Sequence, residues 1–143
     1  KFLLENGSLN SSRNHKGCTS LLLACYKGHL ELVKFLLENG SSLDETLDGR
    51  TCLMIAAQYG HLKLVKWLLE NGSSVKEKTP DGTTCLIAAA GDGRLELVKY
   101  LVENGCSLNE KRNDGTTCLL QAALNGHLEL IKWLLQNGCS LNE

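Results

Sequence analysis

Apolar and polar positions along the chain follow the spacing of short amphipathic helices. In the segment 62–70 the apolar residues lie on one helical face: Leu62, Val65, Leu68 and Leu69. Asn71-Gly72 follows, and glycine ends helices because it adopts the left-handed conformation at little cost. We therefore predict a helix over 62–70. A second predicted helix, 52–59, precedes it and is closed by Gly60.

This pattern recurs every 33 residues, as turn dipeptides at that interval show: Asp48-Gly49, Asp81-Gly82 and Asp114-Gly115. A threonine stands before each predicted first helix: Thr19, Thr51, Thr84 and Thr117. A threonine hydroxyl can accept from a free N–H group of the first helical turn, so these residues are predicted to be helix N-caps. The first complete unit is one residue shorter than the two that follow it, and the missing residue falls in the loop between Gly40 and Asp48.

The intervals divide the chain into a partial unit and four complete ones: 1–15, 16–47, 48–80, 81–113 and 114–143. Isolated helices shorter than about 12 residues are marginal in water, so these short helices must pack on their neighbours. We predict an all-α solenoid of stacked helix-turn-helix units joined by β-turn or hairpin-like loops, as a single domain. Both ends lack a polar outer face, so we expect flanking repeats or domains and regard the chain as a fragment of a longer protein.

The segment 48–72 resembles the ankyrin repeat position by position, with the pattern Asp-Gly-x-Thr-x-Leu-x-x-Ala-Ala-x-x-Gly-His-x-x-x-Val-x-x-Leu-Leu-x-x-Gly. The resemblance covers nearly the whole chain and implies an ankyrin-repeat solenoid. The family's tetrapeptide Thr-Pro-Leu-His is Thr51-Cys52-Leu53-Met54 here, and the other repeats also lack its proline and histidine. The family histidine is implied to bridge neighbouring turns. We expect the apolar residues that replace it to pack instead: Leu22, Met54, Ile87 and Leu120.

Composition excludes several functional classes. Fifteen basic and sixteen acidic residues leave a net charge of −1, which disfavours nucleic acid or anionic lipid as a partner. The longest apolar runs, such as 21–26, are far too short for direct membrane insertion, which needs about 18 to 20 residues. The sequence has no paired catalytic carboxylates, phosphate-binding glycine loop or Ser–His–Asp set, so we predict neither an enzyme nor a cofactor. His29, His61 and His127 recur with the repeat, in a column that Arg94 interrupts, and we interpret them as structural.

Seven cysteines are present, and their odd number in a repeat protein favours a reducing, intracellular compartment, either cytoplasm or nucleus. Equivalent cysteines in adjacent repeats would be about 8 to 10 Å apart, too far for a disulfide, which needs Cα atoms within about 7 Å. We expect small buried thiols. The alternative is a redox-active or metal-binding cysteine, although no Cys-x-x-Cys or His-x-x-x-His pair supports zinc.

One aromatic residue occupies the same position in each second helix: Phe2, Phe35, Trp67, Tyr100 and Trp133. We predict a packed ladder beneath the convex side, and the alternative is an exposed stripe that binds a partner. Beside this column, Lys66 with Glu70 and Lys99 with Glu103 are predicted to form solvated i, i+4 pairs.

The resemblance implies that partners bind the turn tips and the exposed side of the first helices, which form the concave face. The corresponding residues are Arg13, Lys16, Tyr26, Lys27, Asp48, Arg50, Gln58, Tyr59, Lys78, Asp81, Thr83, Asp92, Lys111, Asp114, Leu124 and Asn125. The N-terminal part of this face is basic, and tyrosines commonly anchor interfaces. We therefore expect a protein or extended peptide with acidic residues opposite the first two units.

The resulting functional prediction is a non-catalytic protein–protein interaction module, a scaffold of the kind that repeat proteins provide. Two alternatives stay open. The segment could be a regulatory or targeting arm of a larger enzyme or channel, or it could be a structural spacer or self-association element.

Overall fold

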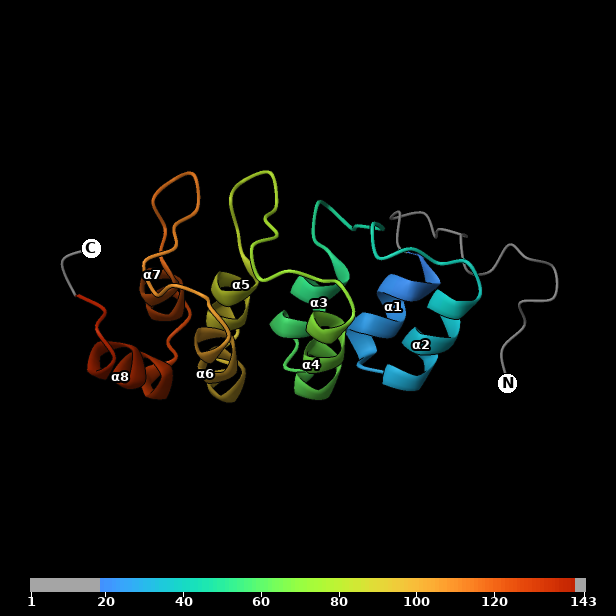
Figure 1. Ribbon diagram of the computed structural model, residues 1–143. Coiled ribbons are helices and arrows are strands. Elements are labelled where there is room, and N and C mark those ends of the chain that lie inside the picture. The colour runs from blue at the N-terminus through green and yellow to red at the C-terminus, as the bar shows by residue number, and fades with distance from the viewer. Residues whose placement is uncertain (1–18, 141–143) are drawn as a thin grey trace.

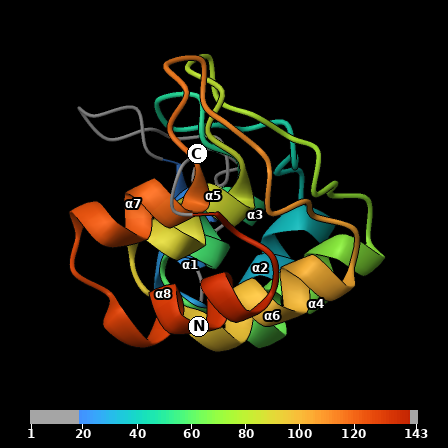
Figure 2. The same ribbon diagram turned by 90° about the vertical axis from the view of Figure 1, so that its left-hand side faces the viewer.

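The computed structural model describes residues 19–140, in which pairs of short antiparallel helices stack side by side. The described helices are α1 (Ser20–Lys27), α2 (Leu30–Glu38), α3 (Cys52–Gln58), α4 (Leu62–Glu70), α5 (Cys85–Gly91), α6 (Leu95–Glu103), α7 (Cys118–Leu124) and α8 (Leu128–Gln136). The odd-numbered helices form one layer and the even-numbered helices form the other, with the connecting hairpins projecting beside the first layer (Figures 1 and 2). The chain is thus an all-α solenoid, as predicted.

Each first helix begins at the threonine that the sequence predicts. In all four repeats the threonine hydroxyl accepts a hydrogen bond of 3.2 or 3.3 Å from the backbone N–H three residues further on. The second helix over 62–70 has the predicted bounds. The helix predicted over 52–59 ends one residue earlier, because Tyr59 is its C-cap.

A second hydrogen bond of three of the capping threonines, Thr19, Thr51 and Thr84, was not predicted from the sequence and closes the repeat on itself. The Thr84 hydroxyl donates to Glu110 Oε1 at 2.7 Å, and the other carboxylate oxygen of Glu110 accepts from the Ser107 N–H at 3.1 Å. The same arrangement joins Thr19 to Glu45 and Thr51 to Glu77. The loop after the second helix is therefore fastened to the start of the first helix of its own repeat.

The residues that replace the family histidine pack in the core. Leu22, Met54 and Ile87 are buried, as predicted. Leu120, at the same position in the last described repeat, is 42% exposed because no described repeat follows to cover it. Between the interior repeats the first helices approach closely through alanines without exposed surface: Ala56, Ala57, Ala89 and Ala90.

The one-residue deletion lies at a hairpin tip, inside the predicted interval. Residues 47–50 form a two-residue hairpin closed by backbone hydrogen bonds of 2.9 and 3.0 Å, and Asp48 and Gly49 both have positive φ, at 54° and 80°. Such a pair is the mark of a type I′ turn. In the next repeat the turn over 79–83 contains one more residue, Pro80, and a bond from the N–H of residue 82 to the carbonyl of residue 79 closes it. The deletion changes the turn type and leaves the helices unaltered.

The aromatic column is half-buried. Trp67, Tyr100 and Trp133 pack against the core, as the ladder interpretation predicted, and lysines of the preceding repeats cover two of the rings. Lys34 Nζ lies 5.9 Å from the centre of the Trp67 ring, and Lys66 Nζ lies 5.2 Å from that of Tyr100. Phe2 lies outside the described residues.

The predicted i, i+4 ion pairs are wrong. Lys99 Nζ contacts Glu96 Oε2 at 3.7 Å, an i, i+3 pair, in place of Glu103. Lys66, in turn, lies over an aromatic ring, and no ion pair within 19–140 joins it to Glu70. Its own i−3 position is Lys63, so the acidic partner that the other repeats provide there is missing.

No helix in the described part of the chain has the length and apolar character needed to cross a membrane.

Candidate functional site

Two adjoining regions hold the candidate binding residues that the structure describes: the ends of the first helices and the hairpins beside them. We call these residues the concave surface: Tyr26, Lys27, Asp48, Arg50, Gln58, Tyr59, Lys78, Asp81, Thr83, Asp92, Lys111, Asp114, Leu124 and Asn125. All of them are exposed or half-buried, and their elements form one continuous row in Figure 1. Arg13 and Lys16 lie outside the described residues.

An aromatic pair lies at the N-terminal part of the concave surface. The rings of Tyr26 and Tyr59 meet edge to face, with centroids 4.6 Å apart and an interplanar angle of 82°. Lys27 Nζ lies 5.2 Å from the centre of the Tyr26 ring, and Tyr26 is 42% exposed. The structure thus joins exposed Tyr26 and half-buried Tyr59, from two repeats, into a single aromatic patch with a positive charge beside it.

The histidine column connects the repeats and holds the ends of the first helices. His61 Nε2–H donates to the Tyr26 carbonyl at 2.7 Å, and His127 Nε2–H donates to the Gly91 carbonyl at 2.8 Å. Arg94 takes over this role in the third complete repeat, where its Nε–H donates to the carbonyl of the residue before Tyr59 at 3.1 Å. The structural role predicted for this column is confirmed for His61 and His127.

These bonds require glycine before the second helix. Gly93 has a φ of 70°, and a Cβ atom there would lie 2.6 Å from His127 Nδ1. A side chain of the following repeat therefore hydrogen-bonds to the backbone at the end of a first helix, where several residues of the concave surface lie. The glycine that directly precedes this histidine or arginine in every complete repeat is a sequence signal for the inter-repeat bond.

The hairpin tips of the last two repeats are joined by two residues that the sequence did not single out. Arg112 Nη2 lies 3.3 Å from Asp81 Oδ2 and 3.8 Å from Asp114 Oδ2. Asn113 donates its backbone N–H to the Asp81 carbonyl at 2.8 Å and its side-chain N–H to the Pro80 carbonyl at 2.9 Å. Asp81 and Asp114 therefore already interact within the protein, which limits what they can offer a partner.

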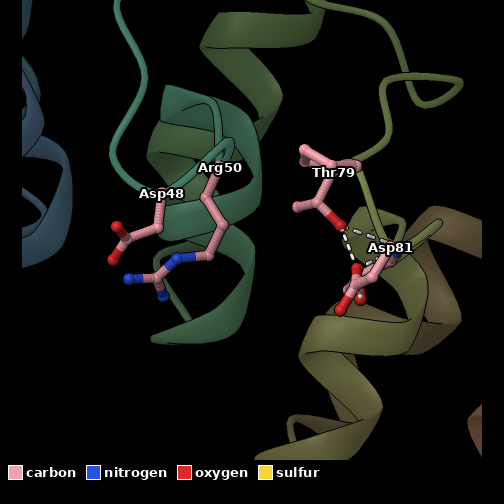
Figure 3. Close-up of a pocket in the computed structure, with 6 residues that line it drawn as sticks. Asp48, Arg50, Thr79 and Asp81 are labelled. Carbon is pink, nitrogen blue, oxygen red and sulfur yellow. Dashed lines mark hydrogen bonds between the residues drawn. The ribbon is translucent and has the colours of Figure 1, made fainter.

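Hydroxyl groups stabilise the ionised form of both aspartates. The side chains of Thr79 and Thr83 donate to Asp81, which lowers the pKa of its carboxyl from 3.8 to about 2. The pKa of Asp114 is likewise lowered, because Thr116 hydrogen bonds to it. Figure 3 shows Asp81 directed toward Thr79, with Arg50 on the neighbouring hairpin across a cavity of about 310 Å³.

A second hollow, of about 200 Å³, lies between the first helices of the last three repeats. Two arginines line it, and each is held by a glutamine: Arg50 Nη1 donates to Gln58 Oε1 at 2.7 Å, and Arg112 Nη1 donates to Gln121 Oε1 at 3.4 Å. Asn125 Nδ2 donates to the backbone of the helix that forms the floor, at 2.7 Å. Sequence reasoning identified Arg50, Gln58 and Asn125 but missed Arg112 and Gln121.

Six cysteines of the described chain are buried and form no disulfide: Cys25, Cys52, Cys85, Cys106, Cys118 and Cys139. The expectation of small buried thiols is confirmed for these six, and Cys18 lies outside the described residues. Within residues 19–140 no group of three or more potential ligands could hold a metal ion.

Cys85 lies beside Cys106, and Cys118 lies beside Cys139, each pair within one repeat. Only equivalent cysteines in neighbouring repeats were compared in the sequence, so these pairs were not predicted. A hydrogen bond between Cys85 and Cys106, together with burial, raises the pKa of the Cys85 thiol, which stays protonated. Burial and the neighbouring Cys139 raise the pKa of Cys118 to about 12. Both thiols are thus strongly protonated near neutral pH and have little nucleophilic character.

Comparison with known proteins gives one family. A family model described as ankyrin repeats (3 copies) matches residues 1–79 and 72–143. Two curated relatives, each named serine/threonine-protein kinase TNNI3K, come from Mus musculus and Rattus norvegicus. Each is 47% identical over 45 residues, and the match covers 31% of this chain and 5% of the relative.

Proposed function

This chain belongs to the ankyrin repeat family, and we propose that it is a non-catalytic module that binds a peptide or protein partner on its concave surface. Ankyrin repeats are generally protein–protein interaction modules. The observation that supports this surface most strongly is the pair of exposed Tyr26 and half-buried Tyr59, because tyrosines are common anchors of interfaces.

The distribution of variable residues favours the same surface. At the position of Tyr26 the following repeats have Gln58, Gly91 and Leu124, whereas the capping threonine is the same in every complete repeat. A fixed scaffold that presents different side chains at one position is how repeat proteins encode specificity. Packing between repeats does not explain the variation on the concave surface, which favours a role in binding.

Charge indicates what the partner carries. Lys27 and Arg50 form no ion pair with a carboxylate among the described residues. Lys27 is the last residue of α1, and Arg50 lies in the hairpin just before α3. An acidic segment of the partner would neutralise them and would be guided to this end of the surface. The buried thiols, which form no disulfide among the described residues, favour a partner in the cytoplasm or nucleus.

A partner captured from a cell extract by the 143-residue chain tests the proposal, once it has been purified and its affinity measured. The double variant Tyr26→Ala/Tyr59→Ala is expected to weaken binding about tenfold or more, as loss of an interface anchor does. Leu128→Ala, an exposed apolar residue on α8 outside the concave surface, serves as the matched control. If the double variant binds as tightly as the control, the concave surface is not the interface.

A second candidate is a regulatory or targeting arm of a larger enzyme. The name of the matched relatives favours it, because they are protein kinases of which the matching segment is only 5%. Kinase assays on a full-length chain, with and without residues 1–143, would test it. An activity that does not change on removal of the segment would count against this candidate.

A further inference from the structure

The hollow between the first helices exists because α5 has the smallest side chains of its row. Helix α5 has Ala88 and Gly91 where α3 has Ile55 and Gln58. A Cβ atom on Gly91 would lie 3.0 Å from Gln121 Cγ, so even one added carbon begins to fill the space. The result is an opening of about 200 Å³ on the concave surface, of a size that a single side chain can enter.

The walls of the hollow present guanidinium groups in fixed orientations. Gln58 and Gln121 each bind one Nη1 atom, of Arg50 and Arg112 respectively, and leave the remaining N–H groups of each arginine for other acceptors. The planar fork of a guanidinium group matches a carboxylate in geometry as well as in charge. Holding the arginine in advance also reduces the entropy lost when an acceptor binds.

The two arginines differ in the charge they can still offer. Arg112 is already balanced by Asp81 and Asp114, at 3.3 and 3.8 Å. Arg50 has no ion pair within residues 19–140. The lining also includes one acidic residue, Asp92. Arg50 is therefore the group that would attract an acidic ligand, and Asp92 is the group that would oppose it.

We propose that this hollow receives the carboxylate of a glutamate or aspartate side chain from an extended segment of the partner. The Arg50 guanidinium anchors the carboxylate, Gln58 orients that guanidinium, and the absence of larger side chains at Ala88 and Gly91 leaves the space that the acidic side chain occupies. The proposal rests on the proposed function of the concave surface. It adds the chemistry of one contact and assigns it to the boundary of repeats 48–80 and 81–113.

Two pools of capped nine-residue peptides test the proposal. One pool has glutamate at its central position and the other has glutamine, with mixtures of neutral residues elsewhere. Binding to the 143-residue chain is followed by NMR, with the backbone amide of Gly91 as the local reporter. The glutamate pool is expected to bind about tenfold more tightly than the glutamine pool, since hydrogen bonds to a charged group are roughly twice as strong as neutral ones.

Four variants locate the effect. Arg50→Gln removes the anchor, and Ala88→Gln fills the hollow with the residue that α7 has at this position, Gln121, so both are expected to abolish the preference for glutamate. Lys63→Gln removes the same charge from the exposed surface of α4 and is expected to keep the preference. Asp92→Asn removes the opposing charge and is expected to increase it severalfold. Thermal unfolding of each variant shows whether it has folded. If Ala88→Gln does not fold, Arg50→Gln alone decides whether the preference for glutamate depends on the hollow.

The outcomes separate this proposal from the proposed function. The carboxylate site is overturned if neither pool binds, if both bind equally, or if Arg50→Gln keeps the preference for glutamate. A partner that depends on Tyr26 and Tyr59 but is indifferent to Arg50 and Ala88 would also overturn it, while leaving the concave surface as the interface.

Discussion

Replacing Thr84 by valine tests the bond between Thr84 and Glu110 that closes this repeat on itself. Valine has nearly the shape of threonine, so the change removes the hydroxyl without leaving a cavity. The hydroxyl accepts from the Ile87 N–H at 3.2 Å and donates to Glu110 at 2.7 Å. Loss of an N-cap costs about 1 kcal/mol, and loss of a hydrogen bond to a charged group costs about 1.5 to 3 kcal/mol. Because the half-buried Glu110 can regain water, we expect the free energy of unfolding to fall by about 2 to 3 kcal/mol.

Urea unfolding followed by far-UV circular dichroism measures this change, with equal slopes required for wild type and variant. Thr46→Val is the matched control, because Thr46 is half-buried in a loop and its hydroxyl makes no hydrogen bond to a described residue. Surface changes of that kind lie within about 0.5 kcal/mol of wild type. A Thr84→Val variant as stable as the control would refute the reasoning.

Three further predictions follow from the site. His127→Ala should lower the free energy of unfolding by about 1 kcal/mol through loss of its bond to the Gly91 carbonyl, whereas His127→Arg should recover part of it, as Arg94 does naturally; equal losses in urea unfolding would contradict this. Alkylation of Cys118 by a thiol reagent at neutral pH should proceed only on unfolding, because its pKa is about 12; rapid labelling of the folded chain would be evidence against it. The lowered pKa of Asp81 stabilises the fold above its unfolded value of 3.8, and this contribution should disappear as the pH falls through about 2; an NMR titration midpoint near 3.8 would disprove it.

Most of the fold could be predicted, because the repeat makes each local signal appear several times. The threonine caps and the bounds of 62–70 follow from patterns that the structure confirms. The bond between Thr84 and Glu110 was missed because it joins residues 26 positions apart, and hydrophobic periodicity says nothing about polar contacts between a loop and a helix start. Its signal was present: a Ser-x-x-Glu sequence follows each second helix in the described repeats.

The candidate site was less predictable than the fold. The sequence indicated which columns vary, but it did not predict that the rings of Tyr26 and Tyr59 meet. The sequence could not show that Asp81 already accepts hydrogen bonds from threonines and forms an ion pair with an arginine, since those partners come from two different loops. The hollow was also beyond reach, because it depends on what α5 lacks at Ala88 and Gly91 together with how far arginines of neighbouring repeats extend.

Hydrogen–deuterium exchange on a purified partner complex tests most directly whether the concave surface is the interface. The account predicts slower exchange at the C-terminal ends of α1, α3, α5 and α7 and in the hairpins beside them, with α2, α4, α6 and α8 unchanged. Protection confined to the second helices and their aromatic column would contradict the account, because the partner would then bind the opposite side of the stack.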